Sequence, residues 1–270
     1  MYKLIALDMD GTLFNSKKEI TQRTKTAIAK AKAKGIKVVL ATGRPLDGIK
    51  PALSELNLIE ESEYVLCFNG ALVVNAKTNE AIFECVLNGK DYKELANAAK
   101  ELNLHHHAFS ARHGLITDEL NYYTDYEAQI NKLDITVVNP QVDILDDEAI
   151  IKVMFIDPPE VLAEAMPKMP VWISERYNAF NSSPFFFEIT NKNVDKGAGL
   201  KQLAQYLNIA QAEVIACGDE ANDYSMINYA GLGVAMGNAI DKVKAVANYI
   251  TDTNDEDGVA KVIEKFMLND

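Results

Sequence analysis

The segment Leu4–Thr12, with the sequence LIALDMDGT, decides how the rest of the chain is interpreted. Its first four residues form an apolar run typical of a short buried strand, and Asp8 and Asp10 follow directly. The next two residues, Gly-Thr, allow a turn, so both carboxylates can reach one small volume at the strand's end. One could bind Mg²⁺ or attack an electrophile while the other moves a proton. A solvated acidic turn is the simpler alternative.

Two regions of the chain alternate apolar strand-like runs with helix-like segments. In the first, we predict strands at Lys3–Leu7, Ile36–Ala41 and Tyr64–Phe68, a helix at Thr21–Lys34, and a helix from Pro45 that Pro51 should shorten or kink. In the second, we predict strands at Val214–Cys217 and Leu232–Met236, and helices at Lys196–Leu207, Asn222–Tyr229, Ala239–Ala247 and Glu256–Met267. This alternation predicts a doubly wound parallel sheet of the α/β, Rossmann-like class, covered on both faces.

The middle of the chain follows a different pattern. A hairpin, Ala71–Val74 with Ala81–Val86, leads into a helix at Asp91–Asn103, short mixed strands and a strand at Phe185–Thr190. This mixture is typical of an α+β module. We therefore predict a core domain of residues 1–83 and 190–270, interrupted by an inserted α+β domain of residues 84–189.

Composition limits the classes of partner. The 270 residues include 27 basic and 39 acidic side chains, a net charge of −12, which argues against nucleic acid or an anionic membrane surface. A small anionic substrate remains possible, because a bound metal sets the field in a pocket. No run approaches the roughly 20 apolar residues of a membrane helix, and no signal-peptide pattern occurs. With three scattered cysteines, we expect reduced thiols and a cytoplasmic protein.

Four groups of polar residues follow predicted strands or begin helices of the core. They are Asp8 with Asp10; Thr42, Gly43 and Arg44; Lys196; and Asp219, Asn222 and Asp223. Taken singly, these are ordinary turns, surface charges or helix caps. In a doubly wound sheet, however, ligands bind beyond the carboxyl ends of the strands. Acids, a hydroxyl, a cation and more acids at that edge together predict a phosphate-plus-metal site.

The four groups, in this order and with the insert after the second, resemble the haloacid dehalogenase superfamily of phosphohydrolases. The position of the insert resembles the Cof-type branch with its C2-type cap, and the YidA-like sugar phosphatases in particular. The similarity extends over nearly the whole chain. It is carried by LDMDGTL (7–13), VLATGRP (39–45), FNGAL (68–72), KVMFID (152–157), DKGAGL (195–200), GDEAND (218–223) and YAGLGVAM (229–236).

The resemblance implies a role for each site residue. Asp8 would be the nucleophile that forms an aspartyl-phosphate, and Asp10 would protonate the leaving alcohol and then activate water. Mg²⁺ would be bound by the carboxylates of Asp8 and Asp219 and the backbone carbonyl of Asp10, with Asp223 acting through water or as support. The transferring oxygens would be held by Thr42, the Gly43 amide, Lys196 and Asn222.

Some details stay open. The role of Asp10 requires a proton for part of the cycle, and we expect the like charge of Asp8 to raise its pKa, with a bound metal acting in the opposite direction. Arg44 could touch the substrate or form a structural ion pair. His105–His107 invite a metal interpretation, but alternate residues of a strand face opposite sides, and packing is the simpler role.

We therefore predict a Mg²⁺-dependent phosphomonoesterase acting on small phosphorylated metabolites, with sugar phosphates as the favoured class, and working as a monomer or homodimer. A phosphotransferase or phosphomutase that uses the same aspartyl-phosphate is the first alternative. A receiver-like signalling module also uses an acidic Mg²⁺ pocket, but it is about 120 residues long and has no inserted cap.

Overall fold

The computed structural model describes residues 1–268, which form two compact units. The core unit comprises Met1–Glu84 and the chain from Asp195 onward, and the inserted unit comprises Cys85–Val194. The first boundary lies one residue beyond the expected one, and the second lies five residues beyond its expected position. The second differs because the strand at Phe186–Asn191 belongs entirely to the sheet of the inserted unit.

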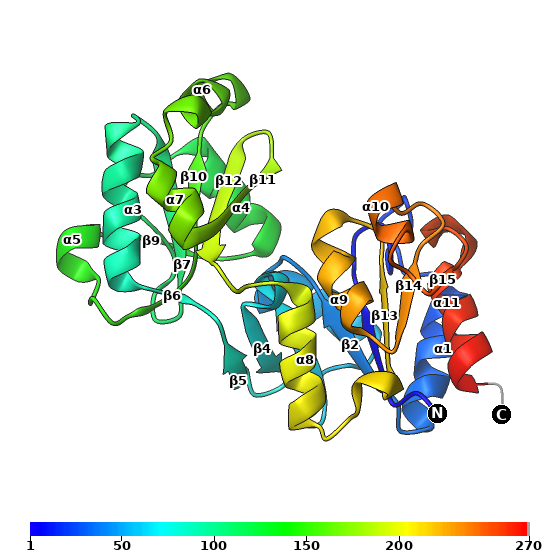
Figure 1. The fold of residues 1–270 in the computed structure, drawn as a ribbon. Coiled ribbons are helices and arrows are strands. Elements are labelled where there is room, and N and C mark those ends of the chain that lie inside the picture. Colours follow the sequence, from blue (N-terminus) through cyan, green and yellow to red (C-terminus); the bar gives the residue numbers. More distant parts are fainter. Residues whose placement is uncertain (269–270) are drawn as a thin grey trace. The chain divides into compact units, whose positions relative to one another are not determined.

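Within the described residues, the core unit contains an eight-stranded sheet (Figure 1). Its strands, in spatial order, are β15 (Tyr249–Ile250), β14 (Leu232–Ala235), β13 (Val214–Gly218), β1 (Leu4–Leu7), β2 (Lys37–Ala41), β3 (Tyr64–Cys67), β4 (Leu72–Asn75) and β5 (Ala81–Glu84). Neighbouring strands from β15 to β3 are parallel, and β4 and β5 add an antiparallel hairpin at one edge. The predicted parallel α/β core is confirmed.

The register of β1 positions the candidate site. Leu7, the last residue of β1, lies opposite Leu40 of β2 on one side and Cys217 of β13 on the other. All four residues of β1 are fully buried, so the apolar run fixes this strand in the middle of the sheet. Because the three parallel strands end in step, the residues that follow them emerge at the same edge.

Helices cover both faces of the core sheet. Figure 1 shows α8 and α9 on one side, and α1 beside α11 on the other. The helices are α1 (Gln22–Ala33), α2 (Leu46–Glu55), α8 (Lys196–Tyr206), α9 (Tyr224–Tyr229), α10 (Asp241–Lys244) and α11 (Gly258–Ile263). None of the helices in residues 1–268 combines the length and apolar character that crossing a bilayer requires.

Local signals explain some of the helix ends. The Thr21 side chain caps α1 by accepting a hydrogen bond from the Thr24 amide, as its sequence position predicts. Pro51 does not end α2, which continues through this residue to Glu55. The helix expected at 239–247 is confined to the short α10, and the chain then adds the edge strand β15.

The inserted unit folds around its own, mostly antiparallel sheet. Its strands are β6 (Leu87–Asn88), β7 (His105–Ser110), β8 (Gly114–Thr117), β9 (Ile135–Val137), β10 (Ala149–Ile156), β11 (Tyr177–Ser183) and β12 (Phe186–Asn191). Its helices are α3 (Gly89–Glu101), α4 (Tyr122–Asn131), α5 (Pro140–Asp143), α6 (Pro159–Ala165) and α7 (Val171–Arg176). Tyr92 and Leu95 of α3 pack with Val153 and Phe155 of β10 in a separate hydrophobic core.

Candidate active site

Asp8 lies at the point where β1 leaves the sheet. Its amide still continues the ladder by donating to the Cys217 carbonyl at 3.0 Å, and the residue is only 7% exposed. The chain then turns at Gly11, which has a φ of +84°. A Cβ there would lie 2.2 Å from Oδ2 of Asp219, so only glycine fits between the turn and that carboxylate.

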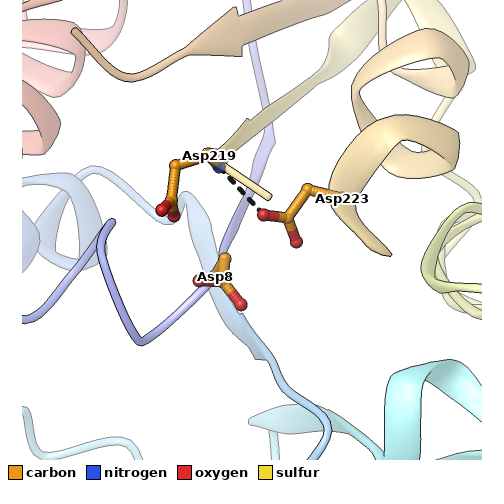
Figure 2. A group of neighbouring side chains, drawn as sticks. All are labelled: Asp8, Asp219 and Asp223. Atoms are coloured by element: carbon orange, nitrogen blue, oxygen red, sulfur yellow. Dashed lines mark hydrogen bonds between the residues drawn. The ribbon is translucent and has the colours of Figure 1, made fainter. Parts of the chain in front are cut away.

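Three buried acids meet at this edge of the sheet (Figure 2). One carboxylate oxygen each of Asp8, Asp219 and Asp223 lies within 4.8 Å of the other two. The Thr12 hydroxyl donates to Oδ1 of Asp219 at 2.7 Å, which orients that side chain. A cluster of carboxylate oxygens is the donor set that Mg²⁺ prefers, so the residues present fit a divalent metal ion.

Electrostatics also favour a cation at the cluster. Burial raises the pKa of Asp8 to about 7, with Lys196 lowering it in part and Asp223 raising it further. Burial likewise raises the pKa of Asp219 to about 6, against the lowering effect of its hydrogen bond from Thr12. Negative charge is therefore disfavoured on both side chains, and a bound cation would relieve this cost.

Lys196 is the buried cation of the site. It is the first residue of α8 and is fully buried, and its Nζ donates to Oδ1 of Asp8 at 2.5 Å and to Oδ1 of Asp223 at 2.6 Å. Burial alone would lower its pKa, but the two carboxylates outweigh burial and hold the pKa above its ordinary value. The ammonium group therefore stays charged and links the strand end of β1 to the loop after β13.

The carboxylate of Asp223 is fully engaged by neighbouring groups. One oxygen accepts from Lys196, and the other accepts from the amides of Asp219 and Glu220 at 2.9 and 3.0 Å. The dashed line in Figure 2 marks the bond from the Asp219 amide. These contacts shape the loop after β13, which fits a supporting role for Asp223 better than direct metal binding.

Asp10 differs from the acidic cluster in its surroundings. Its side chain is 40% exposed, and its two oxygens accept from Nζ of Lys18 at 2.7 Å and from the Arg44 guanidinium at 2.6 Å. Partial burial raises the pKa of Asp10, but these two ion pairs lower it more, and the pKa falls below its ordinary value. The expected upward shift is wrong, because the charges that contact Asp10 are cations.

The segment after β2 is held by the segment after β3. Thr42 is buried, its Oγ1 accepts from the Arg44 amide at 3.1 Å, and its carbonyl accepts from the Asn69 amide at 2.8 Å. A Cβ on Gly43 would lie 3.3 Å from the side-chain amide of Asn69, so the loop passes close to that residue. The Arg44 guanidinium pairs with Asp10, which is one of the two roles that the sequence left open.

Asn69 is a site residue to which the sequence interpretation assigned no role. Its side-chain oxygen accepts from Nδ2 of Asn222 at 3.0 Å, so it joins the loop after β2 to the loop after β13. It has a φ of +56° and lies between Phe68 and Gly70, which also have positive φ values. An Asn-Gly pair directly after an apolar strand was the available signal.

The histidine run belongs to the inserted unit, and its members have separate partners. Exposed His105 lies 3.1 Å from Asp157, buried His106 lies 3.4 Å from Asp118, and buried His107 lies 3.2 Å from Thr124. Among residues 1–268, Asp8, Asp219 and Asp223 are the only three His, Cys, Asp or Glu side chains that lie close enough together to share a metal ion.

Of the predicted site residues, four therefore form one contact network, and the others have separate partners. The network consists of Asp8, Lys196, Asp219 and Asp223. Asp10 contacts Arg44, and Asn222 contacts the unforeseen Asn69. Thr12 and Lys18 also contact predicted acids, although the sequence interpretation assigned them no ligand or catalytic role.

Comparison with known proteins places this geometry in a family. The family of haloacid dehalogenase-like hydrolases matches residues 5–263. YxeH of Bacillus subtilis (strain 168), named as a candidate phosphatase, is 43% identical over 269 residues, covering 99% of each chain. The B. subtilis 5-amino-6-(5-phospho-D-ribitylamino)uracil phosphatase YcsE is 35% identical over 266 residues, covering 98% of this chain and 96% of its own.

A solved structure shares both units of the fold. The haloacid dehalogenase-like hydrolase from Bacteroides thetaiotaomicron superposes with a TM-score of 0.87 at 37% identity, covering 99% of this chain and 100% of its own. A match that extends over both chains includes the inserted unit as well as the core. The chain therefore belongs to the haloacid dehalogenase-like hydrolase family and, within it, to the phosphatases.

Proposed function

We propose that this phosphatase is a Mg²⁺-dependent phosphomonoesterase that hydrolyses small phosphorylated metabolites through an aspartyl-phosphate on Asp8. One observation carries the proposal: buried Lys196 bridges Asp8 to the acidic loop at the carboxyl end of the parallel sheet. A nucleophilic carboxylate, a fixed cation and oxygen ligands for a metal thus meet where such folds bind phosphate. The pattern of acids alone would also suit a structural metal site.

Two steps account for the reaction. In the first, an Asp8 oxygen bonds to phosphorus, the bond from phosphorus to the substrate oxygen breaks, and Asp10 gives its proton to the leaving alcohol. In the second, Asp10 removes a proton from water, whose oxygen bonds to phosphorus while the bond to Asp8 breaks. Free alcohol and inorganic phosphate are the products, and both carboxyl groups return to their starting states.

Asp8 and Asp219 would hold the metal, with Asp223 supporting them. A bound Mg²⁺ would offset the negative charge that Asp8 and the phosphoryl group bring together. Lys196 keeps its positive charge beside Asp8 and would stabilise the transferring oxygens. Thr42, the Gly43 amide and Asn222 would contribute hydrogen bonds to the same oxygens, with Asn222 oriented by Asn69.

We assign the substrate to phosphorylated sugars and sugar-like alcohols. The support is the substrate for which the relative YcsE is named, which carries its phosphate on a ribityl chain. We assign the selection of the leaving group to the inserted unit. Three free cysteines fit the reducing, cytoplasmic setting that we propose.

The test is phosphate release from a panel of sugar phosphates and polyol phosphates, with Mg²⁺ and with EDTA. We expect turnover only with Mg²⁺, and loss of nearly all turnover in Asp8→Asn. Asp47→Asn, which alters an exposed carboxylate paired with Lys50, is the matched control and should retain full activity. Normal turnover in Asp8→Asn would contradict the proposal, and isomerised sugar phosphate without inorganic phosphate would favour a phosphomutase.

A further inference from the structure

We propose that Lys18 is a positioning residue that holds Asp10 in the orientation its proton transfers require. This inference rests on the proposed function, in which Asp10 is the general acid and base. A general acid must lie within hydrogen-bond reach of the leaving oxygen, so the orientation of its carboxyl group affects the rate.

Cations from two separate segments bind the carboxylate of Asp10. Lys18, in the turn after β1, contacts Oδ1 at 2.7 Å, and Arg44, in the loop after β2, contacts Oδ2 at 2.6 Å. Contacts to both oxygens from different directions fix the rotamer and the plane of the carboxylate. Asp10 would therefore be oriented before substrate arrives.

The backbone at Lys18 adopts an uncommon conformation that the surrounding turn holds in place. Lys18 has a φ of +60°, a left-handed conformation that is unfavourable for a lysine. The turn is built by Asn15, whose side-chain oxygen accepts from the amides of Lys17 and Glu19 at 3.0 and 2.9 Å. The Asn15 carbonyl also accepts from the Lys18 amide at 2.9 Å.

The turn is anchored independently of the Lys18 ion pair. Nδ2 of Asn254 donates to the Phe14 carbonyl at 2.9 Å, and the Ser16 amide donates to Oδ1 of Asp255 at 2.8 Å. These bonds tie the turn to the C-terminal part of the core unit. Replacing the ammonium group of Lys18 should therefore leave the turn in place.

Because the side chains of Lys18 and Asp10 are exposed, an effect of Lys18 on the orientation of Asp10 can be distinguished from an effect on folding stability. The side chain of Lys18 is 67% exposed and that of Asp10 is 40% exposed, and exposed ion pairs contribute little to folding. Lys18→Met should fold normally, and a loss of activity would then report on Asp10. Arg44 is a poorer probe because it directly follows Thr42 and Gly43 in the segment proposed to bind phosphate.

The experiment compares leaving groups that differ in their need for a proton. The probes are phenyl phosphate, whose leaving group is strongly basic, and 4-nitrophenyl phosphate, whose leaving group is weakly basic. In Lys18→Met we expect kcat/KM to fall roughly tenfold on phenyl phosphate and by less than about twofold on 4-nitrophenyl phosphate, because only the first departure depends strongly on the acid. Lys18→Arg should restore the phenyl phosphate activity, and Lys17→Met, which alters the neighbouring exposed lysine, should match wild type on both esters.

Two outcomes would overturn this inference while the wild type remains active. Equal losses on the two esters would assign Lys18 to substrate binding or folding, and unchanged kcat/KM on both would remove any role in orienting Asp10. If the wild type with Mg²⁺ released phosphate neither from these esters nor from the panel of sugar and polyol phosphates, the proposed function itself would fail, and the inference with it.

Discussion

At the scale of single residues, the charge balance of the site depends on Lys196. Its ammonium group is buried between Asp8 and Asp223. Removing one partner of a buried ion pair leaves an uncompensated charge, so Lys196→Met should lower the free energy of unfolding by about 3 kcal/mol in the absence of metal. The same change should abolish phosphate release.

Urea unfolding and phosphate release measure the two effects of Lys196→Met. Lys201→Met, at an exposed position of the same helix α8, is the matched control and should change neither quantity appreciably. A Lys196→Met protein with wild-type stability and turnover would mean that the two buried carboxylates do not need this cation.

Single residues also mark the limit of prediction from sequence. The acids at 8, 219 and 223 could be selected because each follows an apolar strand-like run at the expected edge. The contact of Asp10 with Lys18 could not be found in this way, since it depends on a turn with a left-handed residue. Asn69 was missed for the same reason, because its role depends on local φ values and on a partner, Asn222, 153 residues away.

At the scale of elements, the turn after β1 must pass close to Asp219. Gly11→Ala would place a Cβ 2.2 Å from Oδ2 of Asp219 and would displace this carboxylate. We expect weaker Mg²⁺ binding and a loss of most turnover, since Asp219 is a proposed metal ligand. Titration of activity against Mg²⁺ concentration measures the effect.

Gly35 provides the control for this prediction. It has a similar φ of +79°, but a Cβ there would meet nothing within 4 Å. Gly35→Ala should therefore cost only the backbone strain, about 1 kcal/mol of stability, and should keep wild-type Mg²⁺ dependence. If the two variants lost activity equally, the close approach of Gly11 to Asp219 would not explain the loss.

Elements themselves were predictable where the local pattern was strong. The apolar runs of β1, β2 and β13 identified these strands, and Thr21 identified the start of α1. The register between strands was not predictable, because the pairing of Leu7 with Cys217 depends on packing between distant segments. Pro51 was misleading because α2 continues through it, which local propensity does not predict.

At the scale of the whole molecule, metal binding should depend on pH with a definite sign. The pKa of Asp8 is raised to about 7 and that of Asp219 to about 6, both above the ordinary carboxyl value of 3.8. Between pH 3.8 and about 7, the metal-free folded state therefore binds more protons than the unfolded state. The stability of that metal-free state rises as the pH falls through this range. At the proposed metal site, Mg²⁺ would displace these protons in the same range.

The rise in Tm on adding Mg²⁺ should accordingly be larger at pH 8 than at pH 6. At pH 8 both carboxylates are ionised and Mg²⁺ binds without proton release, whereas at pH 6 binding to Asp8 releases a proton. Differential scanning fluorimetry at a fixed Mg²⁺ concentration makes the comparison. An equal shift at both pH values would contradict the assignment of these buried acids as metal ligands.

The central claim is that Asp8 receives the phosphoryl group, and covalent trapping tests it most directly. In Asp10→Asn, 4-nitrophenyl phosphate should still phosphorylate Asp8, because its leaving group needs little protonation, while loss of the base slows hydrolysis of the aspartyl-phosphate. Acid quenching, borohydride reduction and peptide mass spectrometry should then find homoserine at position 8, alongside a nitrophenol burst of one equivalent per enzyme molecule. A full burst with residue 8 unmodified, or with the reduced residue elsewhere, would contradict the account.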